Sequence, residues 1–132
     1  MENLFIPETS RTPAVRLDYQ NGKLEFSGHR CMPETALIFF APVNDWVGKY
    51  IKTTSNKTTE IVFNLQYYNT SSSKSFIDIF KALEKLVIDG KQVILKWFYD
   101  EEDEDMEQNA DDMKDSLRYI KVEKFTNPQN GE

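Results

Sequence analysis

Two runs of β-branched and aromatic residues, separated by one amphipathic segment, constrain the fold of this chain more than any other feature. Residues 61–67 (Ile-Val-Phe-Asn-Leu-Gln-Tyr) and residues 93–99 (Val-Ile-Leu-Lys-Trp-Phe-Tyr) have the composition of buried strands. Between them, apolar residues at helical spacing are expected to face the sheet, among them Phe76, Phe80 and Leu83. Gly90 follows where a helix C-terminal cap is expected. Strand, helix and strand in this order predict two parallel strands joined by a right-handed crossover.

The N-terminal part of the chain adds strands and one long helix. Leu4–Ile6, ended by a proline, is a plausible edge strand. Apolar and polar residues alternate on both sides of Asn21-Gly22, a dipeptide that suits a two-residue turn, so we predict a hairpin at about residues 14–28. The apolar spacing over residues 31–52 predicts a helix with a kink or a break at Pro42, because proline removes a backbone donor.

The remaining segments complete an α/β pattern. Residues 53–59 form a polar loop, residues 106–117 carry a narrow apolar stripe at helical spacing, and residues 120–125 suggest a last strand. We therefore expect an α/β fold, with one mixed β-sheet, helices packed largely on one face, and the βαβ unit at its centre. A single domain is expected over residues 1–126, followed by a polar tail over residues 127–132.

Composition limits the compartment and the architecture. A chain of 132 residues with 39% hydrophobic and 13% aromatic residues suits one packed domain. No apolar run approaches the roughly 18–20 residues that span a bilayer, so we expect no membrane insertion. The N-terminus lacks the basic flank and apolar stretch of a secretion signal. The one cysteine cannot form an internal disulfide, which fits a cytoplasmic location.

The net charge of −6 is concentrated in one stretch. Residues 100–115 contain ten acidic residues and one lysine, whereas the rest of the chain carries a net charge of +3. Without a basic cluster, nucleic acid is not expected as a partner. A calcium loop needs a glycine turn, and the acidic run has no glycine, so an acidic helix start in water is the favoured interpretation.

No catalytic system or cofactor site is evident in the sequence. His29 is the only histidine, and with Cys31 it would make at most half of a zinc site, so an ordinary surface histidine and a partly buried thiol are favoured. The five glycines are scattered singly, which excludes a phosphate-binding glycine-rich loop. We therefore expect no enzyme activity, no metal and no cofactor.

One polar segment stands at the position where α/β folds place their functional sites. It lies between the first buried strand and the following helix, where ligands bind outside the carboxyl ends of strands. Its four consecutive hydroxyl residues exceed what one helix cap requires. A cap with solvated neighbours, a functional site and a small-anion site all remain open here. The segment consists of Tyr68, Asn69, Thr70, Ser71, Ser72, Ser73 and Lys74.

These residues also carry a family resemblance that extends over almost the whole chain. The chain closely resembles the SiaC-type biofilm-regulation phosphoprotein family, and the Tyr-Asn-Thr-Ser-Ser segment is the most specific part of the match. The matching segments are residues 65–74 (Leu-Gln-Tyr-Tyr-Asn-Thr-Ser-Ser-Ser-Lys), 77–79 (Ile-Asp-Ile), 97–103 (Trp-Phe-Tyr-Asp-Glu-Glu-Asp), 4–7 (Leu-Phe-Ile-Pro), 12–13 (Thr-Pro) and 42–46 (Pro-Val-Asn-Asp-Trp).

The resemblance implies a fold similar to STAS domains and a partner-switching function. In such systems a dedicated Ser/Thr kinase phosphorylates the switch protein and a PPM-type phosphatase reverses it. The unmodified form binds and stimulates a diguanylate cyclase, or another signalling protein, and so raises cyclic di-GMP. The phosphorylated threonine of the family corresponds to Thr70, with Ser71 and Ser72 as alternates, and the segment Tyr68–Lys74 is the implied partner-binding surface. The alternative is a STAS-like domain that binds a small molecule or nucleotide without phosphoregulation.

Overall fold

Six strands form one mixed sheet whose spatial order follows the order of the chain. The computed structural model describes residues 1–127. The pairs β1–β2 and β2–β3 are antiparallel, and β3 to β6 run parallel to one another. The strands are β1 (Leu4–Ile6), β2 (Ala14–Asp18), β3 (Lys23–Cys31), β4 (Thr58–Tyr68), β5 (Gln92–Asp100) and β6 (Lys121–Asn127).

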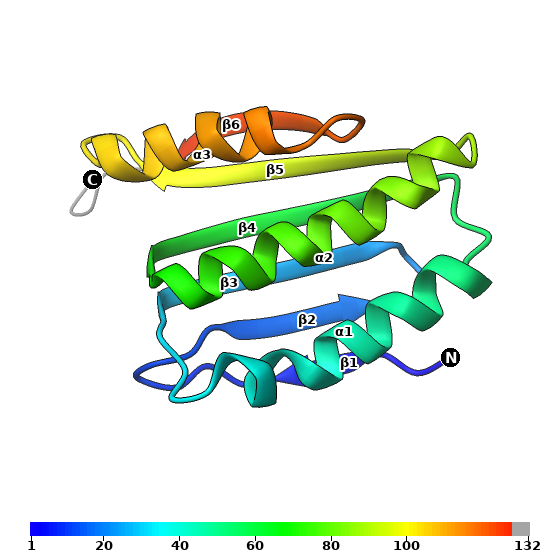
Figure 1. The fold of residues 1–132 in the computed structure, drawn as a ribbon, viewed down its shortest axis with the longest axis horizontal. Helices are drawn as coiled ribbons and strands as arrows, with labels where there is room; N and C mark the ends of the chain where they lie inside the picture. Colours follow the sequence, from blue (N-terminus) through cyan, green and yellow to red (C-terminus); the bar gives the residue numbers. More distant parts are fainter. Residues whose placement is uncertain (128–132) are drawn as a thin grey trace.

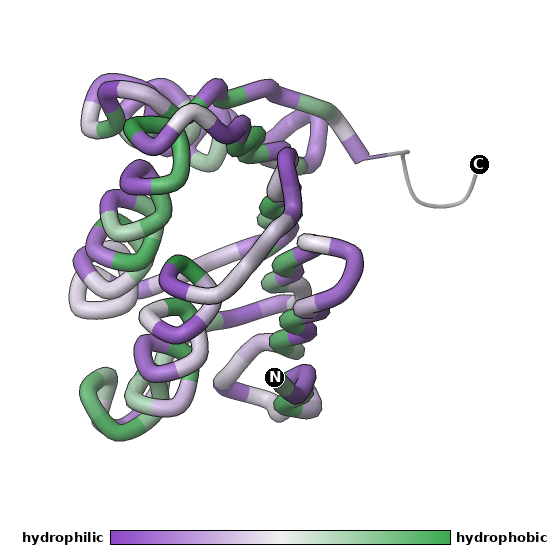
Figure 2. The backbone as a smooth tube through the Cα atoms, turned by 90° about the vertical axis from the view of Figure 1, so that its right-hand side faces the viewer, coloured by the Kyte–Doolittle hydropathy of each residue, from purple (hydrophilic) through white to green (hydrophobic). Residues whose placement is uncertain are grey.

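The helices of the described residues all cover the same face of this sheet. They are α1 (Ala36–Thr53), α2 (Thr70–Ile88) and α3 (Glu104–Ser116). Figure 1 shows them in front of the strands, with α2 crossing from β4 to β5 in the right-handed sense. Figure 2, at right angles, shows the helices on one side with hydrophobic residues toward the sheet. The predicted α/β fold, with helices on one face and a central βαβ unit, is confirmed.

An aromatic cluster between the sheet and α2 forms the centre of the core. The Phe76 ring packs edge-to-face against Phe63 of β4, Phe26 of β3 and Phe40 of α1, with ring centroids 4.9, 5.4 and 5.2 Å apart. Each such pair contributes roughly 0.5–1.5 kcal/mol beyond the burial of apolar area. Trp97 of β5 stacks on Phe63 at 4.1 Å. As predicted, the side chains on the inner face of α2 are buried, namely Phe76, Phe80 and Leu83.

The prediction of a helix from residue 31 was wrong at its start. Cys31 is the last residue of β3 and pairs with Tyr68, so this end of the segment is held by a strand that lies far along the chain. Helix α1 begins only at Ala36 and continues through Pro42 without a break. Pro42 and Ile38, whose carbonyl loses its donor to the proline, are both exposed residues and so lie on the solvent side of the helix. For this reason the proline does not divide the helix.

The hairpin was predicted correctly, but its turn is longer than expected. Strand pairing ends at Asp18 and Lys23, which leaves a four-residue loop in place of the two-residue turn. The Asp18 side chain accepts hydrogen bonds from the backbone and side chain of Asn21 and so caps this loop. Gly22 has a φ of +65°, and a Cβ atom there would lie 2.9 Å from the Thr58 carbonyl oxygen. The glycine is therefore required by its contact with β4 as well as by its backbone conformation.

Three further boundaries differ from the sequence prediction or refine it. Thr58 and Thr59 belong to β4 rather than to a loop, and the Thr59 hydroxyl bonds the buried Tyr50 hydroxyl at 2.7 Å. Gly90, with φ of +95°, directly follows Asp89, the C-cap of α2, and so ends the helix where the sequence predicted. Strand β6 continues through Asn127, the first residue of the predicted tail, and residues 128–132 lie outside the described part of the chain. Within residues 1–127, no helix is long and apolar enough to cross a bilayer.

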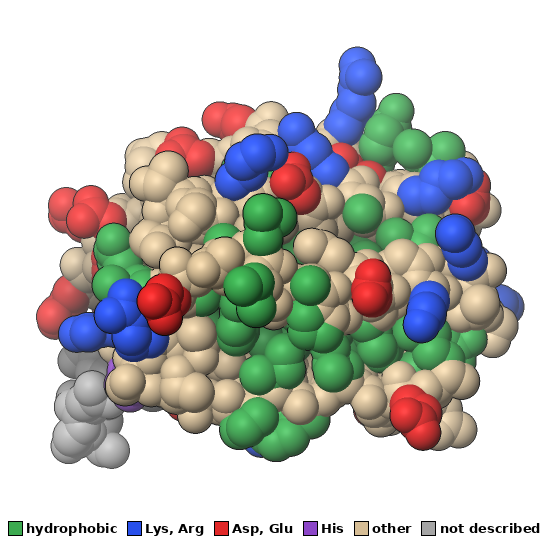
Figure 3. All heavy atoms as spheres, turned by 60° about the horizontal axis from the view of Figure 1, so that its bottom comes forward, with side chains coloured by type: hydrophobic (Ala, Val, Ile, Leu, Met, Phe, Trp, Pro, Cys, Tyr) green, Lys and Arg blue, Asp and Glu red, His purple; other side chains and the backbone are tan. Residues whose placement is uncertain are grey.

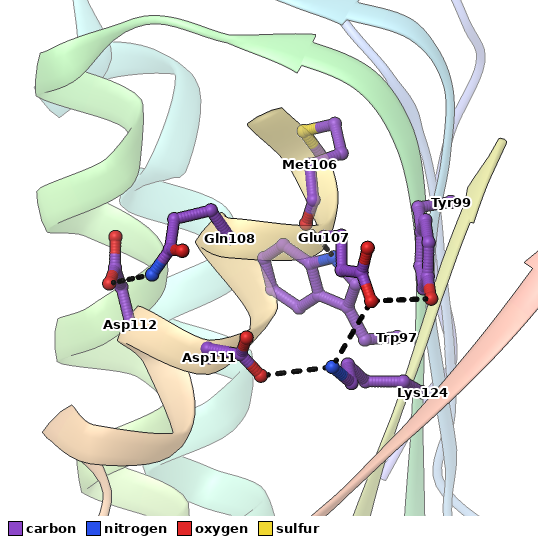
Figure 4. Close-up of polar contacts among 8 residues, drawn as sticks. All are labelled: Trp97, Tyr99, Met106, Glu107, Gln108, Asp111, Asp112 and Lys124. Atoms are coloured by element: carbon purple, nitrogen blue, oxygen red, sulfur yellow. Dashed lines mark hydrogen bonds and ion pairs between the residues drawn. The ribbon is translucent and has the colours of Figure 1, made fainter. Parts of the chain in front are cut away.

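The acidic stretch forms α3, which is anchored to the sheet by buried apolar side chains and by the polar contacts drawn in Figure 4. Its predicted inner stripe of Met106, Ala110 and Met113 is buried. The Trp97 indole donates a hydrogen bond to the Met106 carbonyl at 3.1 Å. Lys124 of β6 lies 3.0 Å from an Asp111 oxygen, and this hydrogen bond is the main cause of the raised pKa of Lys124. The Asp111 carboxylate of the acidic stretch is therefore paired with a lysine of the sheet.

Candidate functional site

Strand β4 ends where helix α2 begins, and this junction contains the polar segment singled out in the sequence. Tyr68 is the last residue of β4, and Asn69 is the N-cap of α2. The Asn69 side-chain oxygen accepts a hydrogen bond from the Ser72 amide at 3.0 Å, which satisfies one of the free donors of the first turn. The Asn69 amide bonds the Cys31 carbonyl at 3.1 Å, so the junction is fixed to the end of β3.

Thr70 and Ser71 are the hydroxyl residues at this junction that are open to solvent. Thr70 is the first residue of α2 and its side chain is exposed. Ser71 is also exposed, and its hydroxyl donates to the Asn69 side chain at 3.3 Å. Lys74, one turn later, forms an exposed ion pair with Asp78 at 3.3 Å. A phosphate on Thr70 would therefore lie at the positive end of the helix dipole, with a lysine on the same face.

Ser72 has a different environment from the other hydroxyl residues. Its side chain is fully buried, with 0% exposure, and accepts a hydrogen bond from the Cys31 thiol at 3.4 Å. Burial raises the pKa of the Cys31 thiol to about 11, and a hydrogen bond that the Ser72 hydroxyl can donate to the thiolate opposes this rise. A kinase could reach the Ser72 hydroxyl only if the start of α2 opened, which argues against Ser72 as the alternate phosphorylation site. Ser73 lies half-buried beside it.

Tyr68 contributes to the core more than to the surface of the junction. Its ring centroid lies 6.0 Å from that of Phe76 and 6.2 Å from that of Trp97. Burial raises the pKa of Tyr68 to about 12, and the negative charge of Asp112 on α3 adds to the rise. The hydroxyl therefore stays neutral at physiological pH, and the Tyr68 ring packs on the core residues Phe76 and Trp97 beneath the junction.

Helix α1 also begins at this end of the molecule and presents residues that the sequence analysis did not select. Figure 1 shows α1 and α2 starting on the same side and running in the same direction. The first turn of α1 exposes Leu37 and Ile38, which are 83% and 74% accessible. A signal was present in the sequence, because residues 36–41 (Ala-Leu-Ile-Phe-Phe-Ala) are all apolar and a helix cannot turn six consecutive residues toward one core.

Two clefts lie at the same end of the domain. The first, of about 650 Å³, lies beside the start of α1 and is lined by Arg11, Thr12, Pro33, Glu34, Thr35, Ile38 and Phe39. The second, of about 670 Å³, is lined by Ser10, His29, Arg30, Gln66, Tyr67, Asp100 and Asp103.

The structure separates the two residues that a zinc site would have required. The His29 side chain is exposed and its Nδ1 lies 2.9 Å from the Gln66 side-chain oxygen, whereas the Cys31 thiol is buried against Ser72. Among residues 1–127, no group of three or more His, Cys, Asp or Glu side chains is placed to hold a metal ion.

Comparison with known proteins shows the same fold and a related sequence. An uncharacterised protein of Pseudomonas aeruginosa (strain UCBPP-PA14) is 34% identical over 119 residues, covering 90% of this chain and 93% of that protein. The solved structure of SiaC of Pseudomonas aeruginosa is 31% identical with a TM-score of 0.86, covering 96% of this chain and all of that one. A chain of the crystal structure of diguanylate cyclase SiaD in complex with its activator SiaC, from the same organism, is 31% identical with a TM-score of 0.85, covering 94% of this chain and 99% of that one.

The family model agrees with these likenesses and with the resemblance carried by the residues around Thr70. It describes the SiaC family regulatory phosphoprotein and matches residues 6–126. This range includes all three helices and every strand apart from the first two residues of β1 and the last residue of β6. This chain therefore belongs to the SiaC family of regulatory phosphoproteins.

Proposed function

We propose that this chain is a partner-switching protein that binds and stimulates a diguanylate cyclase while Thr70 is unmodified and releases it when Thr70 is phosphorylated. The observation that carries the proposal is the exposed position of Thr70 at the first residue of α2, outside the ends of the parallel strands. The SiaC protein of Pseudomonas aeruginosa, which is described as the activator of a diguanylate cyclase, supports the choice of partner. Cyclic di-GMP output and biofilm regulation would follow from this interaction.

A kinase and a phosphatase complete the proposed switch, since this chain offers no catalytic group for either reaction at the junction. A Ser/Thr kinase would add the phosphate to the Thr70 hydroxyl, and a PPM-type phosphatase would remove it. The exposure of Thr70 gives both enzymes access without unfolding of the helix. Ser71 is the remaining alternate acceptor, because its hydroxyl is exposed, whereas that of Ser72 is buried.

The phosphate would act on the partner and leave the fold of this chain almost unchanged. It adds about −1.5 to −2 charges at a helix N-terminus, where an anion is favoured. The core beneath is held by the Asn69 cap and the bond between Cys31 and Ser72, neither of which involves the Thr70 side chain. At an interface, however, the phosphate would remove the shape fit and bury an unpaired charge. Binding is therefore expected to weaken while stability is conserved.

The test measures the affinity of this chain for each full-length diguanylate cyclase of its source genome, by calorimetry, together with cyclase activity. We expect unmodified protein and Thr70→Ala to bind one cyclase and stimulate it. Protein phosphorylated at Thr70 should bind at least tenfold more weakly, a loss of about 1.4 kcal/mol. Ala82→Glu serves as the matched control, because it adds a negative charge to the exposed face of α2 away from Thr70.

Two results would contradict the proposal. If unmodified protein and protein fully phosphorylated at Thr70 bind the cyclase with equal affinity, phosphorylation does not control binding. Absence of binding to every cyclase would remove the partner, and a small molecule or nucleotide that raises the melting temperature would then favour the alternative of a ligand-binding domain.

A further inference from the structure

The start of helix α1 presents the most exposed large apolar side chains of residues 1–127. Leu37 and Ile38 are 83% and 74% accessible, and Ala41 and Pro42 are exposed one turn later on the same side of the helix. We call these four residues the α1 patch. Figure 3, which brings the side of the molecule with α1 and β1 forward, shows hydrophobic side chains gathered across the middle of that face. Contiguous apolar surface of this kind marks a binding site more often than scattered single residues do.

The α1 patch is exposed even though the same turns of α1 pack against the core with their other side. The neighbouring residue Phe40 is buried and packs on Phe76, and Val43 and Val47 continue the inner face of the helix. In its second half, α1 is an ordinary amphipathic helix whose exposed residues are polar apart from Gly48. The apolar outer surface is therefore confined to the end of α1 that lies nearest Thr70.

Helix geometry places the patch and Thr70 within one interface footprint. Phe40 of α1 lies level with Phe76 of α2, because their ring centroids are 5.2 Å apart. At 1.5 Å per residue, Leu37 lies about 4.5 Å and Thr70 about 9 Å toward the same end. Packed helices are about 8–10 Å apart, so the two positions are separated by roughly 10–15 Å. A protein interface that buries about 800 Å² per partner is about 30 Å across and is therefore wide enough to span both positions.

A cleft beside the patch provides the recess that a strong contact needs. Ile38 and Phe39 form one wall of the cleft of about 650 Å³, and Arg11 and Pro33 belong to its other sides. The Arg11 backbone accepts a hydrogen bond from the Met32 amide at 2.7 Å, so this wall is fixed to the segment that leads into α1. The residues that dominate interface energies are apolar or aromatic side chains that fill such recesses.

We propose that the α1 patch and its cleft anchor the diguanylate cyclase, with Thr70 at the rim of the same interface. This inference rests on the proposed function and adds to it the surface that would bind the cyclase. A protein partner fits better than a lipid surface, because the exposed carboxylates of Glu34 and Asp45, before and after the patch in the sequence, would be repelled by anionic headgroups. A small apolar centre within polar surroundings is typical of a regulated complex rather than of an obligate dimer of this chain.

The test compares affinity for the cyclase between matched variants. Leu37→Ser with Ile38→Ser removes the apolar contact, and both side chains are exposed, so the fold should be unaffected. The control is Ile88→Ser, which alters a 60% accessible isoleucine at the opposite end of α2. We expect the double variant to bind the cyclase at least tenfold more weakly and the control to bind like the unmodified chain. In the complex, amide hydrogen exchange should slow at residues 36–42 and around Thr70.

The outcomes distinguish this inference from the proposed function. If the double variant binds normally while phosphorylation of Thr70 still weakens binding, the patch is not the anchor and the switch stands. If the unmodified chain binds no cyclase, both fail. Loss of self-association in the double variant, measured by analytical ultracentrifugation, with cyclase affinity unchanged would assign the patch to a second copy. Sedimentation of the unmodified chain, but not the double variant, with anionic vesicles would assign it to a membrane surface. Either result overturns the proposal.

Discussion

Glu84 holds the segment between α3 and β6 to helix α2, and its removal should destabilise the protein more than any other single loss of charge. One oxygen of its carboxylate accepts hydrogen bonds from three consecutive backbone amides, those of Arg118, Tyr119 and Ile120. The bonds to Arg118 and Ile120 are 2.8 and 3.1 Å long, and the side chain of Glu84 is only 7% exposed. Oriented amides of this kind form a site for an anion, which here is supplied by the chain itself.

The magnitude follows from the donors that would be left unpaired. In Glu84→Ala three backbone donors lose a charged acceptor, and each buried donor without a partner costs about 1–3 kcal/mol. Water can reach this segment from the exposed sides of Arg118 and Tyr119, so we expect a total near the low end, about 3 kcal/mol. For a domain of this size that corresponds to a fall in melting temperature of roughly 10 °C. Glu84→Gln, which keeps a neutral acceptor, should cost about half as much.

Urea unfolding measures the free energy directly, and amide hydrogen exchange locates the change. We expect a lower unfolding midpoint with an unchanged m-value, and faster exchange at residues 118–120 than elsewhere in the sheet. Glu102→Ala, which removes an exposed carboxylate from the turn before α3, is the matched control and should change stability by less than about 0.5 kcal/mol. A loss below 0.5 kcal/mol in Glu84→Ala would refute the reasoning, because it would mean that water satisfies the three amides equally well.

Three further predictions concern the core, the thiol and the acidic helix. Truncation of Phe80 to alanine should lower stability by about 3–5 kcal/mol, measured by urea unfolding, and unchanged stability would show that the packing of α2 is wrong. The pKa of Cys31 is raised from 9.0 to about 11, so its contribution to stability is fully present below pH 9 and is lost as the pH rises through 11. Cys31→Ala should show a smaller loss of stability over that range, and an identical profile would contradict the burial of the thiol. Calorimetric titration with calcium should show no tight, saturable site in residues 100–115, and a tight site would require a different arrangement of those carboxylates.

The βαβ unit could be predicted from the sequence because its signals are local. Residues 61–67 and 93–99 are apolar enough to be buried, and the segment between them has one apolar face. The start of α1 could not be predicted in this way, because Cys31 is held in β3 by pairing with Tyr68, and nothing near Cys31 in the sequence indicates that partner. The three amide bonds to Glu84 join positions more than thirty residues apart and leave no local pattern either.

Within the candidate site, the sequence placed the polar segment at the junction of a strand and a helix but did not give the exposure of each hydroxyl. Thr70 and Ser71 are exposed, as a site for a kinase requires, whereas Ser72 points into the core. The helical repeat contained the reason, because Ser72 lies four residues before Phe76 and so shares its buried face. The α1 patch had a comparable signal in the unbroken apolar run of residues 36–41. The burial of Ser72 and the exposure of the α1 patch could be assigned only once the structure showed which side of each helix faces the sheet.

The strand order of the sheet has a consequence for how the chain is made. Because β1 to β6 lie in the sheet in the order of their synthesis, each new strand adds to the open edge left by the one before it. No strand has to be inserted between two that have already paired, and no early strand waits for a partner from the far end of the chain. The sheet can therefore grow strand by strand while the protein leaves the ribosome, because each strand pairs only with the strands that come directly before and after it in the chain. Strand β6 is added last, and the amides just before it meet Glu84 on a helix that has already folded.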